Sequence, residues 1–241
     1  MILTAHQPVY LPWLGLFHKI ALADQFVSFN QVQYQVRDWN NRNKIKTNAG
    51  EIWLSVPVKH KGHLELKYED IAIDNEQPWQ RKHWKSLFLN YKAAPHFEKY
   101  ADYFEDCYRR EWKTLLELNE SMLLWFLKTL GIPVTIQSAR AMDLAGEKSE
   151  LVLDMCVKLG AETYIFGAQG RDYADKEAFA KAGVQPLFQS YKHPVYRQLH
   201  GEFAPYMSVV DLLFNCGEDS LEILMSGNLA KADLMTSSDW R

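Results

Sequence analysis

Short strand-like runs alternate with helical runs along much of this chain, and this alternation restricts the folds available to it. Strands are predicted at residues 2–5, 27–29, 51–58, 71–73, 134–137, 163–166 and 184–188. Helices are predicted at residues 13–23, 149–159, 176–182 and 208–214. Strands that are separated by helices form βαβ units with parallel pairing. The sequence therefore predicts an α/β fold with a mainly parallel or mixed sheet of Rossmann-like character.

A longer helical region interrupts this alternation between residues 76 and 131, where apolar residues recur at helical spacing. One stripe of that region consists of Trp79, His83, Leu87 and Tyr91. Gly131 followed by Pro133 predicts the end of the last helix. We expect one α/β domain over residues 1–241 with a helical insert at 76–131. The tail at 229–241 carries little packing signal and is expected to fray.

Composition excludes several classes of protein. The net charge of −3 gives no global attraction to nucleic acid or to anionic membranes. The three cysteines are far apart and have no metal-ligand spacing, which favours a reducing compartment and predicts no metal site. No signal peptide is visible, and the longest strongly apolar stretch, residues 122–127, is too short to span a bilayer. We expect a cytoplasmic protein that neither inserts into membranes nor binds nucleic acid.

The loop after the first predicted strand concentrates functional groups. His6, Gln7 and Tyr10 stand beside Pro8 and Pro12, which stiffen the loop and end both neighbouring elements. Ligands of open α/β sheets bind at the carboxyl ends of strands, where His6 and Gln7 would lie. The alternative is that the prolines only shape the turn and that His6 is a buried, hydrogen-bonded side chain.

Residues 37–46 form a second polar segment, with arginines, lysines and asparagines around one tryptophan. Arg42 and Lys46 offer anion recognition, Asn43 offers neutral hydrogen bonds, and Trp39 offers a stacking face. Such a set suits a phosphate or a nucleotide-linked sugar. The alternative is a solvated charged loop.

Residues 164–173 form a third segment, in which a strand runs into a Gly-x-x-Gly sequence. Glycines let backbone N–H groups approach a ligand closely, although this sequence is neither a P-loop nor a complete dinucleotide fingerprint. Gly167, Gln169 and Tyr173 are the candidate binding residues.

A fourth segment, residues 188–198, is rich in glutamine, tyrosine and basic residues but has no periodicity. Such a loop in a compact domain is typical of a functional site, and Gln189, Tyr191 and Gln198 are its candidates. We predict that all four segments, residues 4–13, 37–46, 167–173 and 189–198, converge on one cleft.

Asp211 stands among apolar residues of a predicted helix, with Asn215 one turn later. A carboxylate in apolar surroundings is costly unless it is paired, so Asp211 is expected to hold a basic side chain. It acts either as a structural anchor or as a catalytic base.

The chain also resembles a known family. The residues that carry the resemblance are His6 to Gly15, Lys19-Ile20, Asn40 to Asn43, Gln189 and Tyr191, Tyr196 and Gln198, and Leu213 to Gly217. In this order they resemble the WbqC-like family, with Leu16 where an aromatic residue was expected. The resemblance implies a link to surface-polysaccharide (O-antigen) biosynthesis and the attachment of an acyl or aminoacyl group, such as glycine, to an amino sugar. The positions carried over are His6, Gln7, Tyr10, Arg42, Asn43, Gln189, Tyr191 and Gln198.

The first functional hypothesis is an N-acyl or N-aminoacyl transferase whose partners are a nucleotide-linked amino sugar and an acyl or aminoacyl donor. His6 would be the base, with its tautomer set by Asp211 or by a backbone carbonyl. Gln7 and Asn43 would contact the oxyanion or a substrate amide. Arg42 and Lys46 would hold the diphosphate, and Trp39 or Tyr191 would stack on a base or sugar. No cofactor or acyl donor can be identified from the sequence.

Two alternatives remain open. The opening layout of strand, histidine loop and helix resembles nucleotidyltransferases with a paired-histidine loop, but Pro12 stands near the place of the second histidine. His18 lies further into the helix. The other alternative is a carbohydrate-binding or scaffold protein that uses the same aromatic and amide surface without catalysis.

Overall fold

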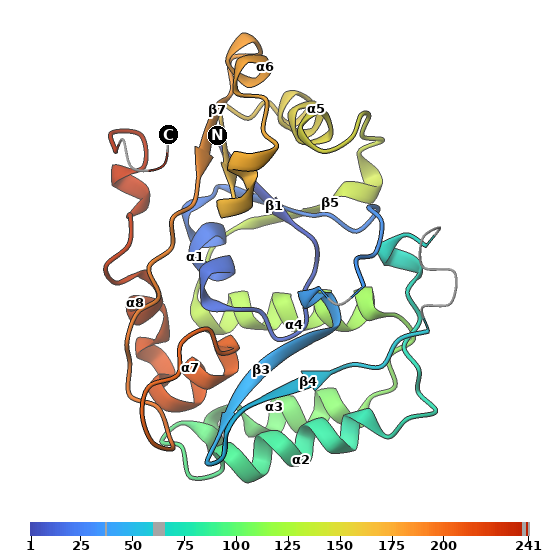
Figure 1. Cartoon of the computed structure of the whole chain (residues 1–241), viewed down its shortest axis with the longest axis vertical. Helices are drawn as coiled ribbons and strands as arrows, with labels where there is room; N and C mark the ends of the chain where they lie inside the picture. Colours follow the sequence, from blue (N-terminus) through green and yellow to red (C-terminus); the bar gives the residue numbers. More distant parts are fainter. Residues whose placement is uncertain (37, 60–65, 238–239, 241) are drawn as a thin grey trace.

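The computed structural model describes residues 1–36, 38–59, 66–237 and 240. Within them, a parallel sheet of five strands stands apart from an antiparallel sheet of two strands (Figure 1). The larger sheet contains β1 (Ile2–His6), β2 (Gln25–Ser28), β5 (Thr135–Ser138), β6 (Thr163–Phe166) and β7 (Gln185–Phe188). The smaller one contains β3 (Arg42–Thr47) and β4 (Gly50–Ser55). The predicted α/β fold class is confirmed.

The strand order of the larger sheet, β5-β2-β1-β6-β7, defines where a ligand is expected. From β1 the chain adds β2 and then β5 on one side, and afterwards adds β6 and β7 on the other. The order therefore reverses between β1 and β6. In open α/β sheets, ligands bind outside the carboxyl ends of the strands at such a reversal. Here that position lies between His6, which ends β1, and Gly167, which follows β6.

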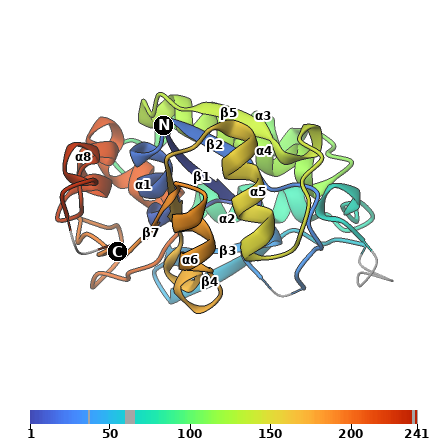
Figure 2. The same cartoon turned by 90° about the horizontal axis from the view of Figure 1, so that it is seen from above.

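Helices cover both faces of the larger sheet. They are α1 (Leu14–Leu22), α2 (Trp79–Tyr91), α3 (Phe97–Arg109), α4 (Leu115–Leu130), α5 (Ser149–Leu159), α6 (Lys176–Lys181), α7 (Val209–Cys216) and α8 (Ser220–Met225). On one face, Leu3 and Ala5 pack with Met155 and Phe179 of α5 and α6. The other face packs on α1 and α4, and α8 lies to one side of the molecule (Figure 2). Alternation along β2 thus places two successive side chains, Phe26 and Val27, in the two separate cores.

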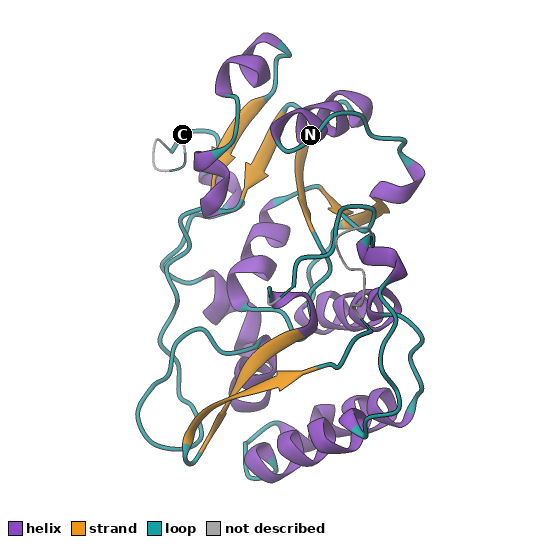
Figure 3. Ribbon diagram, turned by 45° about the vertical axis from the view of Figure 1, so that its right-hand side comes forward, coloured by secondary structure: helices purple, strands orange, loops and turns teal. Residues whose placement is uncertain are grey.

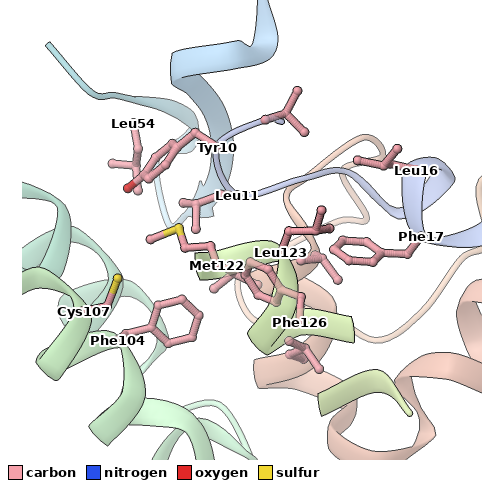
Figure 4. Close-up of a cluster of buried hydrophobic side chains, with 14 of the residues drawn as sticks. Tyr10, Leu11, Leu16, Phe17, Leu54, Phe104, Cys107, Met122, Leu123 and Phe126 are labelled. Carbon is pink, nitrogen blue, oxygen red and sulfur yellow. The ribbon is translucent and has the colours of Figure 1, made fainter. Parts of the chain in front are cut away.

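The expected helical region at 76–131 contains α2, α3 and α4. Thr114 and Glu117 form a capping box at the start of α4, and Gly131 ends it with a left-handed φ of 71°. Helices α2 and α3 and the β3–β4 hairpin lie at the end of the molecule away from α6, and α4 lies between this end and the larger sheet (Figure 1 and Figure 3). Their apolar residues join the loop after β1 in one core, where Leu11 and Met122 lie close together (Figure 4).

Two strand predictions differ from the structure. Residues 42–47 were expected as part of a polar segment, but they form β3 and pair along their length with β4. Asn43 and Lys46 of this strand are buried although they are polar. The alternation of apolar and polar residues that indicates a half-buried strand is therefore missing from its sequence. Residues 71–73 form isolated bridges rather than a strand, because Ala72 pairs with Thr114 and Ile73 pairs with Val58.

The described part of the tail is packed, contrary to the expected fraying. Leu234 is fully buried and Trp240 is 3% exposed, and both contact Leu22 of α1 and strands β6 and β7 in a small core. The carbonyl of Trp240 also accepts a hydrogen bond of 2.7 Å from the backbone N–H of Phe188. These contacts are made across long stretches of sequence, which is why local composition did not indicate them.

Among the residues that the structure describes, no helix is long and apolar enough to cross a membrane. The same residues contain no group of three or more histidine, cysteine, aspartate or glutamate side chains arranged to hold a metal ion.

Candidate functional site

A cavity of about 390 Å³ opens at the reversal point of the larger sheet. It is lined by His6, Val9, Trp13, Gly15, Leu16, Lys19, Asp38, Trp39, Gly167, Ala168, Gln169, Gln189, Tyr191, His193 and Tyr206. All four polar segments that the sequence singled out contribute side chains or backbone to it. The volume lies within the range of small-molecule sites, about 300–1,000 Å³. The cavity is therefore the candidate binding site.

His6 ends β1 and lines the cavity with a defined tautomer. Its Nδ1 lies 2.7 Å from the carbonyl oxygen of Gln7, and a carbonyl can only accept, so Nδ1 carries the proton. This assignment leaves Nε2 as a proton acceptor. Burial, together with the nearby charge of Lys19, lowers the pKa of His6 to about 4. The ring is therefore neutral at neutral pH and can act as a base. A backbone carbonyl, rather than Asp211, sets its tautomer.

Lys19 of α1 also lines the cavity. Its side chain is 3% exposed, and its Nζ donates a hydrogen bond of 3.0 Å to the carbonyl oxygen of Ala5. Burial lowers the pKa of Lys19 to about 7. Sequence reasoning did not select this residue as a candidate. The available signal was a single lysine within the otherwise apolar face of residues 14–22.

Indole rings form one wall of the cavity and extend beyond it. The ring centroid of Trp13 lies 5.3 Å from that of His6 and 6.0 Å from that of Trp39. Trp39 in turn lies 5.3 Å from Trp53 of β4, and the guanidinium of Arg42 stands 4.7 Å above the Trp53 ring. Flat aromatic faces of this kind stack on sugar rings or nucleobases. Arg42 lies at the outer end of this wall and does not line the cavity.

Gln189 and Tyr191 also line the cavity and are held by α1 and α8. The Gln189 side-chain amide donates to the carbonyl of Gly15 at 2.8 Å and lies 3.1 Å from Nδ1 of His18. Tyr191 donates its hydroxyl proton to the carbonyl of Leu224 at 3.0 Å. These bonds orient both side chains while leaving part of each on the cavity surface.

Gly167 and Gln169 line the cavity at the end of β6, at the start of a 3-10 helix, η4 (Ala168–Asp172). A Cβ atom added to Gly167 would meet nothing within 4 Å, so a ligand can approach this backbone closely. Gly170 has a different role, because a Cβ there would lie 2.4 Å from the Cβ of Phe166. Of the two glycines, the first faces the candidate site and the second permits close packing.

His193 and Tyr206 also line the cavity, although neither was among the predicted binding residues. Nδ1 of His193 lies 2.8 Å from the carbonyl oxygen of Pro194, which makes Nε2 the acceptor of this ring as well. That Nε2 atom is buried and has no hydrogen-bond partner within the described residues. Tyr206 adopts a left-handed φ of 63° and packs edge-on against His193. Both residues lie in the irregular segment between β7 and α7, which has no periodicity from which their orientation could be predicted.

Asp211, Lys46 and Gln198 lie in a buried polar cluster rather than at the cavity. The Asp211 carboxylate accepts hydrogen bonds of 2.8 Å from Tyr91, Tyr196 and Gln198. Burial raises its pKa, and these hydrogen bonds oppose the increase. Lys46 donates to Gln198 at 3.0 Å and to the carbonyl of Glu202. The cluster ties α7 to α2 and β3, so the structure assigns these three residues to the core and corrects their expected place in the site.

Gln7 and Asn43 support the first loop instead of lining the cavity. Asn43 is fully buried, and its amide donates to the carbonyl of Leu11, a residue with a φ of 45°. Gln7 accepts a hydrogen bond of 3.0 Å from Asn40. Left-handed backbone at a non-glycine residue is strained and needs such support. These amides therefore shape the loop that carries His6.

Tyr10 and Tyr173 also differ from their expected positions. Tyr10 is fully buried, and its hydroxyl contacts His83 at 2.8 Å and the hydroxyl of Tyr108. Tyr173 is 46% exposed and packs edge-on against Phe166 on the far side of η4. Neither residue lines the cavity.

Comparisons with known proteins identify relatives over most of the chain. The sequence profile of the WbqC-like protein family matches residues 7–223. The protein named "Uncharacterized protein Rv1507c" of Mycobacterium tuberculosis (strain ATCC 25618 / H37Rv) is 36% identical over 220 residues, which cover 90% of this chain and 95% of that protein. No solved structure is significantly similar to the chain. The chain belongs to the WbqC-like protein family.

Proposed function

We propose that this protein is an enzyme that transfers an acyl or aminoacyl group to the amine of a nucleotide-linked amino sugar. The observation that carries the proposal is the neutral His6 ring at the cavity, whose Nε2 is left as an acceptor by the bond from Nδ1 to the Gln7 carbonyl. Family membership supports a role related to polysaccharide biosynthesis. The tryptophan wall supplies the flat surface that a sugar or a nucleobase requires.

The chemistry assigned to His6 is removal of a proton from the amine. An amino sugar is mostly an ammonium ion at neutral pH, and it must lose a proton before nitrogen can attack. His6 Nε2 accepts that proton, and the nitrogen lone pair forms a bond to the carbonyl carbon of an activated acyl donor. The bond from this carbon to the leaving group then breaks, and the leaving group departs with the electron pair. It takes up the second proton, which the nitrogen loses as it becomes an amide. Backbone N–H groups at Gly167 and Ala168 are the nearest candidates to stabilise the oxyanion.

The test is transfer activity with a panel of nucleotide-linked amino sugars and activated acyl donors. His6→Gln should lower kcat/KM by roughly 10²–10⁴-fold, the usual contribution of a positioned base. His200→Gln is the matched control, because the ring of His200 also contacts a backbone carbonyl, that of Asn90 at 2.8 Å, but does not line the cavity. A folded His6→Gln protein with normal turnover would refute the assignment of His6.

A second function is favoured by the strand order. The cavity lies where mononucleotides bind in doubly wound sheets, with the histidine loop and the first turn of α1 beside it. A nucleotidyltransferase would use the same position. The two functions differ in their products: nucleotidyl transfer from a nucleoside triphosphate releases pyrophosphate, whereas acyl transfer leaves the nucleotide intact. Ligand binding without either product would favour a carbohydrate-binding protein.

A further inference from the structure

The cavity contains a buried ammonium group that forms no ion pair with any described carboxylate. Lys19 is 3% exposed, and its hydrogen-bond partner within the described chain is the Ala5 carbonyl oxygen. An ammonium group can donate three hydrogen bonds. A buried charge is normally paired, because its removal from water is costly. Lys19 thus presents a basic group to the cavity without a counter-ion among the residues that the structure describes.

The first turn of α1 adds a second positive feature to the same wall. Trp13, the residue before this nine-residue helix, makes no side-chain capping bond, and the first turn contains no acidic residue. Gly15 and Leu16 of that turn line the cavity. The N-terminus of a helix carries a partial positive charge and backbone N–H groups without partners inside the helix, and both features favour anions. The N–H of Leu16 already donates to the Trp13 carbonyl at 3.1 Å, so Leu16 contributes through the helix dipole and not as a donor.

The other charged or titratable groups that line the cavity are Asp38, His6, His193, Tyr191 and Tyr206. Asp38 is the acidic residue among those lining it, but this side chain is exposed and accepts a hydrogen bond of 2.7 Å from the backbone of Trp39. His6 and His193 have lowered pKa values because they are buried, and burial raises the pKa of Tyr191. These three groups are therefore uncharged near neutral pH. Tyr206 also faces the cavity.

We propose that Lys19 and the first turn of α1 form the phosphoryl-binding subsite of this cavity, where they hold the diphosphate of a nucleotide-linked sugar. This inference rests on the proposed function for the identity of the ligand. It replaces the expected diphosphate contact by Arg42 and Lys46, because Lys46 is buried among Gln198 and Glu202 and neither cation lines the cavity.

A consequence for pH follows from this arrangement. Burial holds the pKa of Lys19 at about 7 in the free protein, and a bound anion would raise it. Binding above pH 7 therefore takes up a proton, and the affinity falls as the pH rises. Between pH 7.5 and 9.5 the loss should approach tenfold per pH unit. His6, His193 and Tyr191 keep their uncharged forms over this interval.

The experiment measures binding of defined probes by calorimetry. Uridine diphosphate and inorganic pyrophosphate contain the phosphoryl group, uridine lacks it, and acetate offers a carboxylate instead. Lys19→Met removes the charge and nearly conserves the side-chain volume, so the protein should fold. Lys44→Met is the matched control, since Lys44 lies on β3 outside the cavity and forms an ion pair of 2.6 Å with Glu51. Melting temperatures verify that both variants are folded.

The inference predicts that Lys19→Met weakens binding of uridine diphosphate and pyrophosphate at least tenfold, while Lys44→Met changes it less than twofold. It is overturned if wild type does not bind either phosphoryl probe, or if Lys19→Met binds them normally. Binding of acetate as tight as that of pyrophosphate would also overturn it, in favour of a carboxylate ligand. If Lys19→Met fails to fold, the pH dependence in wild type decides: a constant affinity between pH 7.5 and 9.5 refutes the subsite.

These outcomes are separate from those of the proposed function. Lys19-dependent binding without any acyl transfer would refute the reaction but leave the subsite in place. Acyl transfer together with unchanged binding by Lys19→Met would refute the subsite but leave the reaction in place.

Discussion

The charge of Lys19 should contribute to the low pKa of His6, and this coupling can be measured without knowing the reaction. The pKa of His6 is lowered from 6.5 to about 4, first by burial and then by Lys19. This difference corresponds to roughly 3 kcal/mol in favour of the neutral ring. Replacing Lys19 by Met removes only the second cause. We expect the pKa of His6 to rise in Lys19→Met but to stay below 6.5.

The assay is NMR titration of the imidazole nitrogens in protein labelled with ¹⁵N histidine. The same spectra identify the tautomer, which should carry its proton on Nδ1 because that atom bonds the Gln7 carbonyl. Lys44→Met should leave the His6 titration unchanged. A pKa near 6.5 in wild type, a proton on Nε2, or no change in Lys19→Met would each refute the reasoning.

The same pKa shift predicts how stability depends on pH. His6 is a base whose pKa is lower in the folded than in the unfolded chain, so the unfolded chain binds more protons between pH 6.5 and 4. Its contribution to stability is therefore lost as the pH falls through this window, by about 2 kcal/mol between pH 8 and 5. Burial also lowers the pKa values of His18 and His83 to about 4, and these residues add to the slope. Urea denaturation measures the free energy of unfolding at each pH. Between pH 8 and 5 this free energy should fall by about 2 kcal/mol less for His6→Gln than for wild type. Equal slopes would contradict the burial of this ring.

Four further substitutions separate the site from the scaffold. Gly167→Ala places a methyl group in open cavity space, so stability should be unchanged or rise by up to about 1 kcal/mol, while binding of uridine diphosphate weakens about tenfold. Gly170→Ala should instead destabilise the fold by roughly 1–3 kcal/mol, because its Cβ would clash with Phe166. Asp211→Ala should cost about 3–5 kcal/mol in chemical denaturation, since three buried donors lose their acceptor, yet turnover per folded molecule should remain normal. Trp240→Ala should lower the free energy of unfolding by about 3–5 kcal/mol, whereas a frayed tail would give no change.

Local pattern was sufficient to predict most elements of the fold. Periodic apolar residues indicated α5 at residues 149–159, and the left-handed Gly160 ends it as expected. Backbone preference and side-chain period act within a few residues, so they can be read from one segment. Strand β3 could not be predicted in this way, because its residues are mostly polar. The burial of Asn43 and Lys46 depends on partners far away in the chain.

The positions of polar loops after predicted strands were enough to predict which loops meet at the site, whereas packing in the folded chain selects which of their residues line the cavity. The carboxyl ends of parallel strands meet at one edge, so His6 and Gly167 could be placed together from the chain alone. The sorting of polar side chains followed from packing. Asp211 accepts hydrogen bonds from three donors in the core, whereas Lys19 lines the cavity and forms no ion pair with a carboxylate of the described residues. Burial and charge pairing depend on contacts between segments that are distant in the sequence, and these contacts form only when the chain folds.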